Sequence, residues 1–197
     1  MLYQIIKDLP ALPEELKKMA WEYTGVERDD ALNPWVLGYT HGRALGKDNK
    51  EYGHSTGLPR KQISEAFNQW IYDNITDLFH DVGICVSKTG FDHCGPHRDQ
   101  SRAFTLMYVL KQGSNDAITT FWKEKPGVPV QNYYDNYDEL EFLDQINIPL
   151  ETWCMLDAKA IHSVENIQEG RVSVQVSLNQ NPWIAILSTS PDVTNKG

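Results

Sequence analysis

The stretch AIHSVENIQEGRVSVQVSL, residues 160–178, carries the clearest structural signal in the chain. Its second half, residues 171–178, alternates polar and apolar side chains. Because successive side chains of a β-strand point to opposite faces, this alternation predicts a strand. Usually such a pattern marks one solvent face and one core face. In the alternative, the polar face lies inside the fold, where Arg171 and Ser173 can bind a carboxylate through a guanidinium and a hydroxyl.

Other short β-prone segments precede this strand, and turns rich in Gly, Asn, Asp or Pro separate most of them. They are residues 83–88, 103–110, 117–122, 146–150 and 153–156. Runs of short strands with such turns indicate a sandwich or barrel rather than a parallel α/β sheet. The stretch 123–144 interrupts the series. It is acidic and contains three tyrosines, so we expect an insertion on the rim, suited to a basic or neutral peptide.

Two helices are expected before the strands. Pro13 and the acidic pair that follows it begin an amphipathic segment that runs to about Tyr23. Pro59 begins a longer helix whose apolar residues recur with the helical period. Its predicted packing face contains Ile63, Phe67, Trp70, Ile71, Asn74, Ile75 and Leu78. This face is almost entirely apolar, so we expect the helix to pack flat against a sheet.

The chain length of 197 residues suits one domain with a sizeable core and is short for two. We therefore expect a single domain over residues 1–197. Within it, residues 1–80 would form a helical support and residues 83–180 the β-rich core.

The net charge of −9 and the pI near 5.1 describe an acidic surface. Such a surface repels phosphate backbones, so no nucleic-acid partner is expected. The sequence shows neither a secretory signal nor a membrane span. Its three cysteines lack the spacing of a disulfide framework. We expect a cytoplasmic protein without membrane association, as a monomer or weak homodimer.

A second distinctive segment, HCGPHRDQSR at residues 93–102, lies between two predicted strands. His97 and Asp99 are two residues apart, so in an extended segment they project from the same side. With the distant His162 they supply two imidazoles and one carboxylate, the facial triad of non-haem iron(II) oxygenases. A lone His-x-Asp is weak evidence. The specificity comes from the order: the pair precedes a strand, and the lone histidine precedes a strand that begins with Arg171.

These segments resemble the 2-oxoglutarate- and iron(II)-dependent oxygenase superfamily, specifically its prolyl-hydroxylase-like members. The resemblance covers about residues 83–180. It rests on HRD at 97–99, FTLMYVL at 104–110, AITTFW at 117–122 and IHSVENIQEGRVSVQVSL at 161–178. It implies a double-stranded β-helix, a cupin-like jelly-roll barrel, with the N-terminal helices packed outside it.

The resemblance also implies the catalytic centre and its chemistry. In this family two histidines and an acid bind the iron, and these positions match His97, Asp99 and His162. The implied activity is that of a dioxygenase using Fe(II), 2-oxoglutarate and dioxygen. It would hydroxylate a C–H bond of a peptidyl proline or asparagine, or of a small molecule, and release succinate and CO2.

The co-substrate site is implied in the same way. The family's basic residue on the last core strand binds the distal carboxylate of 2-oxoglutarate, and it matches Arg171. Ser173 completes an Arg-x-Ser pattern also found among these enzymes. A tyrosine near the site often hydrogen-bonds the co-substrate in this family, which makes Tyr108 a further candidate, although core packing is its default role. Arg102 is expected to pair with Asp99 or a nearby acid.

Alternatives remain open at this point. HCGP at 93–96 is also similar to the first iron-binding segment of aspartyl/asparaginyl β-hydroxylases, in which two histidines suffice. His93 would then replace His97 as the first ligand, and Asp99 would have no role. A cupin-like metal enzyme that uses no keto acid would need the triad without the pocket at Arg171. A non-catalytic jelly-roll binding module would need neither.

Overall fold

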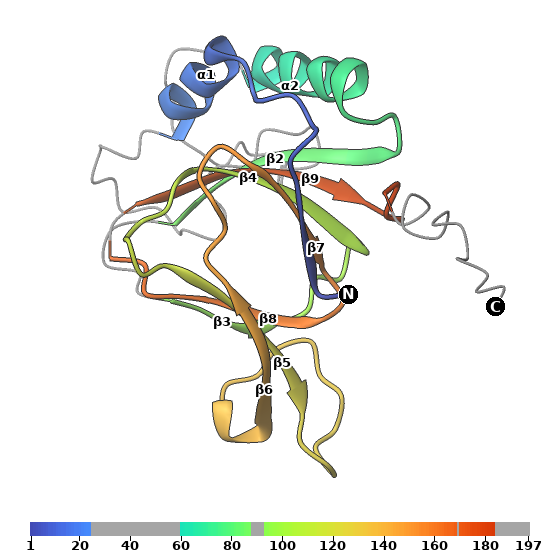
Figure 1. The fold of residues 1–197 in the computed structure, drawn as a ribbon, viewed down its shortest axis with the longest axis vertical. Helices are drawn as coiled ribbons and strands as arrows, with labels where there is room; N and C mark the ends of the chain where they lie inside the picture. The colour runs from blue at the N-terminus through green and yellow to red at the C-terminus, as the bar shows by residue number, and fades with distance from the viewer. Residues whose placement is uncertain (25–59, 88–92, 169, 184–197) are drawn as a thin grey trace, which may run out of the picture.

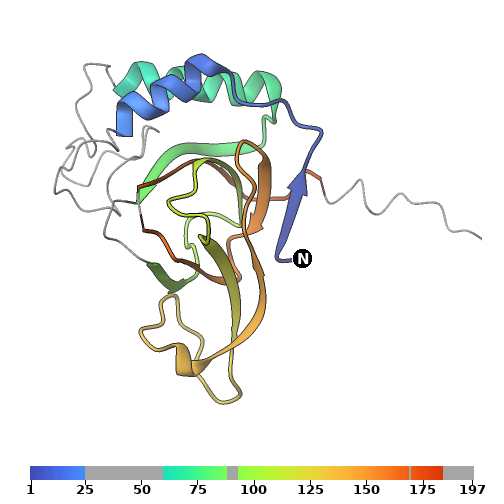
Figure 2. The ribbon, with the colours of Figure 1, turned by 60° about the vertical axis from the view of Figure 1, so that its left-hand side comes forward.

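Two antiparallel β-sheets face each other, and two helices cover the outer side of one of them (Figures 1 and 2). The computed structural model describes residues 1–24, 60–87, 93–168 and 170–183. The prediction of a mainly β fold is confirmed. None of the described helices is long and apolar enough to cross a membrane.

The first sheet has five strands and lies beneath the helices. In spatial order they are β1 (Tyr3–Ile6), β7 (Trp153–Asp157), β4 (Phe104–Lys111), β9 (Arg171–Leu178) and β2 (Phe79–Ser87). All of their pairings are antiparallel. Since β9 lies between β4 and β2, both of its edges are hydrogen-bonded, and every one of its residues is buried.

The second sheet has four strands and carries the two histidines of the predicted triad. In spatial order they are β3 (His93–His97), β8 (Ile161–Glu165), β5 (Ile118–Glu124) and β6 (Leu140–Ile146). The hairpin of β5 and β6 extends beyond the rest of the fold as a projecting arm (Figure 1). A short 3-10 helix, η2 (Tyr137–Glu139), precedes β6.

Both predicted helices are present, as α1 (Glu14–Thr24) and α2 (Arg60–Asn74). Phe67 and Ile71 of α2 are fully buried against the five-stranded sheet, as its apolar periodicity predicts. The four aliphatic residues of β9 belong to the same core cluster. The apolar face of β9 therefore packs toward the helices, and the polar face of β9 is directed toward the second sheet.

The facing sheets share a second, smaller apolar cluster. It contains Met107, Val109, Cys154 and Leu156 from the first sheet, with Phe121 and Ile146 from the second and Ile148 from the connection after β6. The rings of Tyr3 and Phe121 also stack between the sheets, with centroids 5.7 Å apart. These contacts hold the two sheets face to face.

Several predictions of local structure were wrong. The N-terminal region was expected to be helical, but it also contains the strand β1. The stretch 123–144 was expected to be an insertion on the rim, but it contains most of the strand β6. The strand expected at 146–150 ends at Ile146 instead. Five of the seven residues of β6 are exposed, so its sequence lacks the alternation of a half-buried strand. The strands β3 and β8 were not predicted either. β3 contains Gly95 and Pro96, two residue types that are depleted in strands.

Candidate metal centre

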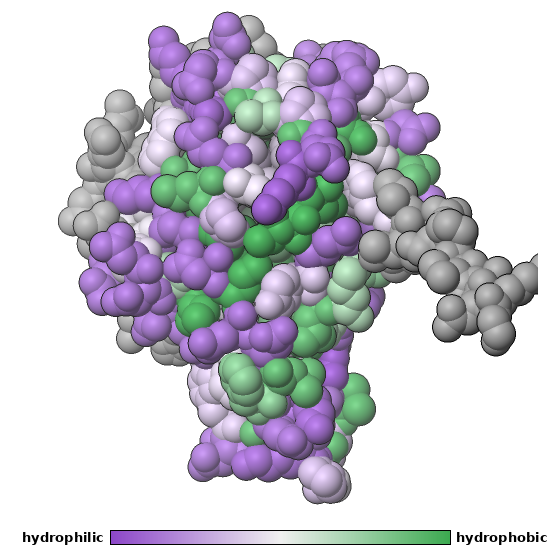
Figure 3. All heavy atoms as spheres, in the orientation of Figure 1, coloured by the Kyte–Doolittle hydropathy of each residue, from purple (hydrophilic) through white to green (hydrophobic). Residues whose placement is uncertain are grey.

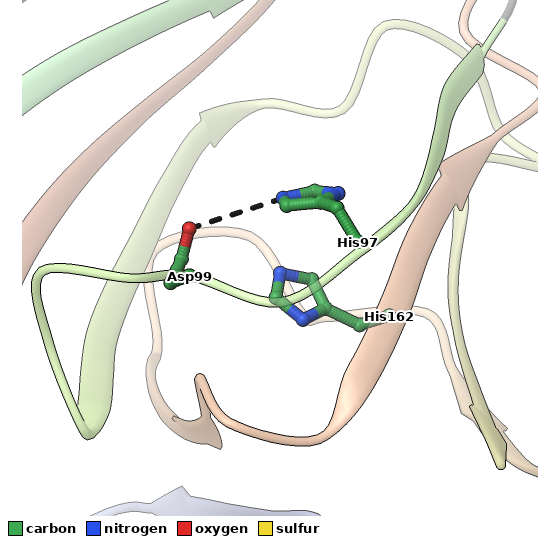
Figure 4. Close-up of side chains that lie close together, drawn as sticks. All are labelled: His97, Asp99 and His162. Carbon is green, nitrogen blue, oxygen red and sulfur yellow. Dashed lines mark ion pairs between the residues drawn. The ribbon is translucent and has the colours of Figure 1, made fainter. Parts of the chain in front are cut away.

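Three potential metal ligands converge between neighbouring strands (Figure 4). His97 ends β3, and His162 is its register partner on β8. Asp99 follows two residues after His97, in the loop before β4. One ligand atom from each of the three residues lies within 4.8 Å of the others. The two imidazole centroids are 4.5 Å apart, and Nε2 of His97 is 3.9 Å from Oδ1 of Asp99.

Backbone carbonyls orient both imidazoles. Nδ1 of His97 lies 2.9 Å from the carbonyl oxygen of Gly95, and Nδ1 of His162 lies 3.0 Å from that of Ala160. A carbonyl oxygen only accepts hydrogen bonds, so each Nδ1 is the donor and carries the proton. In the neutral imidazole with this tautomer, Nε2 has a lone pair for a metal. Metal-binding histidines usually donate their other ring N–H to a carbonyl or carboxylate oxygen in this way.

Asp99 is held as an anion by Arg102, whose Nε donates to Oδ2 at 2.7 Å. The predicted ion pair of Arg102 is therefore confirmed. Burial alone would raise the pKa of Asp99, but the charge and hydrogen bond of Arg102, together with the two histidines, place it below its usual value. The loop itself is fixed by Lys159, whose Nζ donates to the backbone oxygens of Asp99 and Gln100, each at 3.0 Å.

His162 is the most deeply buried of the three. Burial, followed by the proximity of His97, lowers the pKa of His162 to about 4. At neutral pH its imidazole is therefore neutral, the form that binds a metal. An ionised carboxylate and a neutral imidazole at the same point suit a divalent cation.

Arg98 lies between the candidate ligands His97 and Asp99, and its side chain points to the opposite side of the chain, as expected for an extended segment. Its guanidinium forms an ion pair with Glu124 at 2.7 Å and donates to the Tyr134 hydroxyl at 2.9 Å. It also donates to the backbone oxygens of Gln131 and Lys159, at 2.6 and 3.0 Å. Arg98 thus fastens the ligand segment to the β5–β6 loop and to the turn before His162. The sequence alone indicates no role for Arg98.

The β5–β6 loop also contacts the ligand segment through its backbone. Arg98 N donates to Asn132 O at 2.8 Å, and Tyr134 N donates to Pro96 O at 3.0 Å. Between these bonds, Tyr133 forms a β-bridge with His97. The Tyr133 ring stacks on the His97 imidazole, with centroids 6.0 Å apart and planes inclined by 13°. In the sequence, Tyr133 is one of three tyrosines in the acidic stretch, and nothing there predicts its contact with His97.

The polar face of β9 is enclosed between the sheets. Its side chains are buried, with Arg171 only 6% exposed, which agrees with the interpretation that this face lies inside the fold and excludes a solvent face. Nη2 of Arg171 lies 3.9 Å from Sδ of Met107, and the Gln175 amide is 3.4 Å from Oγ of Ser173. At the other end of β9, Arg102 donates to Oγ of Ser177 at 3.4 Å. A row of polar side chains therefore extends along β9 toward Arg102, which is hydrogen-bonded to Asp99.

No protein-family model matches the chain, and no curated protein matches it either. Any functional assignment therefore depends on the residues and the geometry of the site.

Tyr108 lies on the other face of the first sheet. Its ring packs against Trp153, with centroids 4.7 Å apart, inside the core cluster shared with α1 and α2. Its register partner on β9 is Val174, an apolar-face residue. This position is inconsistent with the predicted contact to a co-substrate held by Arg171, and core packing explains Tyr108 instead.

The side chain of His93 lies outside the part of the chain that the structure describes.

Proposed function

We propose that the protein is an iron(II)- and 2-oxoglutarate-dependent dioxygenase that hydroxylates a C–H bond. The observation that carries this proposal is the convergence of His97, Asp99 and His162 within 4.8 Å. Two imidazoles and one carboxylate are the facial-triad ligand set of non-haem iron(II), which leaves adjacent positions for other ligands. Ferrous iron with the keto acid and dioxygen would supply the oxidising power, with release of succinate and CO2.

The strand order supports a double-stranded β-helix as the finer description of the fold. From β2 to β5, consecutive strands alternate between the two sheets, and from β6 to β9 they alternate again. Each sheet therefore takes four of these eight strands, and β1 adds to the first sheet. Eight antiparallel strands in two facing sheets are what a jelly roll contains.

The buried position of Arg171 supports a site for an anionic co-substrate. A guanidinium between the sheets can hold a carboxylate with two charge-assisted hydrogen bonds, and Ser173 on the same face can add a third. Oγ1 of Thr105 and Oε1 of Gln175 are also buried on this side and have no hydrogen-bond partner among the described residues. Buried polar groups are normally satisfied, so these atoms suit a polar ligand or water.

In this proposal the chain's own groups bind and orient the reactants. Arg102 holds Asp99 ionised and directs Oδ1 toward the histidines. Arg171 and Ser173 would fix the keto acid by its distal carboxylate. The facing sheets would exclude water from the reacting centre.

The test is succinate formation from 2-oxoglutarate, with and without ferrous iron, under aerobic conditions. We expect iron-dependent succinate in the wild-type protein and none in His97→Ala, Asp99→Ala or His162→Ala. Iron binding without succinate formation would favour a cupin-like metal enzyme that uses no keto acid. Full turnover by Asp99→Ala would reject the three-ligand set in favour of a two-histidine centre.

A further inference from the structure

The β5–β6 loop is fixed beside the metal ligands by many contacts. Residues 125–136, here called the rim segment, are tied to the HRD motif through the guanidinium of Arg98 and through backbone bonds on either side of Tyr133. Tyr134 adds a bond from its hydroxyl to Glu124 at 2.5 Å. A segment held in this way is preorganised, so a ligand that contacts it would lose little binding energy to ordering.

Tyr133 presents an aromatic surface at the edge of the candidate metal centre. One side of its ring stacks on His97, yet the residue remains 65% exposed. Neighbouring Tyr134, in contrast, is buried, and its hydroxyl is hydrogen-bonded to Arg98 and Glu124. The fold thus holds the ring of Tyr133 in place, and the exposed part of the ring is available to a molecule that reaches the candidate metal centre.

The arm that carries this ring is acidic. Between residues 123 and 146 the chain has six acidic and two basic residues. Two of these acids are paired, Glu141 with Lys123 at 3.2 Å and Glu124 with Arg98 at 2.7 Å, while Lys125 donates to the backbone oxygen of Asp138 at 2.8 Å. The arm therefore retains a net negative charge. Mainly hydrophilic residues cover the end of the arm in Figure 3. Asp135 follows Tyr133 by two positions in the sequence and is exposed.

We propose that Tyr133 and the rim segment form the substrate-docking surface, and that the substrate is a peptide carrying Lys or Arg close to the residue that reacts. This inference rests on the proposed function. An aromatic face attracts a cation, and nearby carboxylates add to that attraction. The acidic residues are spread over several positions of the arm, from Asp135 in the rim segment to Asp144 on β6, which favours a peptide over a free amino acid.

The test is binding of fluorescently labelled ten-residue peptides to the protein loaded with Mn(II), a stand-in for ferrous iron that does not turn over. Three peptides share one sequence except at three positions, occupied by Lys, norleucine or Glu. We expect the Lys peptide to bind at least about tenfold more tightly than the Glu peptide, and more weakly as salt is raised. Fluorescence anisotropy measures each dissociation constant.

Variants then locate the docking surface. Tyr133→Ala should weaken binding of the Lys peptide about fivefold, whereas Tyr133→Phe should retain it because the ring face remains. Tyr72→Ala is the matched control, since Tyr72 is 60% exposed on α2 and should leave binding unchanged. Asp135→Asn should weaken the Lys peptide and leave the norleucine peptide unaffected.

Each outcome separates this inference from the proposed function. Equal binding of the Lys and Glu peptides, or wild-type binding by Tyr133→Ala, would overturn the docking surface. Absence of all peptide binding by a protein that still forms succinate would also overturn it and leave the proposed function intact. Tyr133-dependent binding of the Lys peptide by a protein that neither binds metal nor forms succinate would instead support the docking surface and reject the oxygenase.

Discussion

Nε of Arg102 donates to Oδ2 of Asp99 at 2.7 Å, while Oδ1 of the same carboxylate lies 3.9 Å from Nε2 of His97. One oxygen therefore binds a guanidinium, and the other is directed to the histidines of the candidate metal centre. A carboxylate held in this way offers a single donor atom, as a facial triad requires.

Removing this support should weaken metal binding without removing a ligand. We expect Arg102→Met to lower the affinity for Mn(II) or Fe(II) by about 10- to 100-fold, the usual effect of removing a residue that hydrogen-bonds a metal-binding side chain. Arg102→Lys should recover part of this loss, because charge remains but the guanidinium geometry does not. Anaerobic metal titration measures both. Unchanged affinity in Arg102→Met would show that Asp99 needs no such support.

The contact between Arg98 and Glu124 should contribute to stability. Both side chains are largely buried, so Arg98→Met leaves the Glu124 carboxylate without its cation. We expect the free energy of unfolding to fall by about 3 kcal/mol, the scale for breaking a buried ion pair. Urea denaturation measures it.

The double variant Arg98→Met/Glu124→Gln tests whether this loss comes from the pair. Because the stranded charge is then absent, the combined loss should be smaller than the sum of the two single losses. Strict additivity would mean that the two side chains contribute independently.

The metal-free protein should be destabilised by mild acid. The pKa of His162 is about 4 in the folded protein, against about 6.5 when unfolded, so between these values the unfolded chain binds the additional proton. Stability from the neutral imidazole is complete above pH 6.5 and is lost as the pH falls toward 4, by about 3 kcal/mol in total. Asp99, whose pKa is lowered, adds a further loss only below its unfolded value near 3.8.

Chemical denaturation across this pH range, in the presence of a chelator, measures the slope. His162→Gln should flatten the dependence between pH 6.5 and 4, since the variant has no imidazole at this position to protonate. An unaltered slope in His162→Gln would assign the acid sensitivity to other groups.

The two faces of the first sheet should respond differently to substitution. Arg171→Ala should raise the apparent 2-oxoglutarate constant about 30-fold or more, because losing one partner of a buried charge pair costs about 2 kcal/mol or more. Tyr108→Phe should leave that constant unchanged, since Tyr108 packs toward the helices. Succinate formation at varied 2-oxoglutarate concentration measures both. A normal constant in Arg171→Ala would mean that the polar face of β9 binds something else.

Much of this architecture follows from local sequence pattern. The strand of Arg171 and the apolar face around Phe67 repeat with the periods of a strand and a helix, and both elements form. The helix ends at Asn74, however, so the prediction that its packing face continues to Leu78 was wrong, and Leu78 is exposed. The spacing of His97 and Asp99 likewise determines that both project to the same side. The edge strand β1 and the exposed arm strand β6 escaped prediction because neither combines length with a half-buried face.

The surroundings of the site depended on contacts that sequence spacing does not reveal. Tyr133 lies 36 positions from His97 in the chain, and only the long β5–β6 connection brings the two rings together. The position of Arg98 opposite its two neighbours was predictable from alternation, but its partners were not. Tyr108 was misassigned because a resemblance to a family does not show which face of a strand a residue occupies.

The most direct test of the central claim is the dependence of 2-oxoglutarate binding on the metal. Isothermal titration of the keto acid under anaerobic conditions compares wild-type protein with Fe(II), wild-type protein with a chelator, and His162→Ala with Fe(II). We expect one keto acid per chain in the first sample and binding weakened by at least about tenfold in the other two, since metal and Arg171 would hold opposite ends of one molecule. Equal affinity in all three samples, or no binding in the first, would contradict an iron(II)/2-oxoglutarate centre at His97, Asp99 and His162.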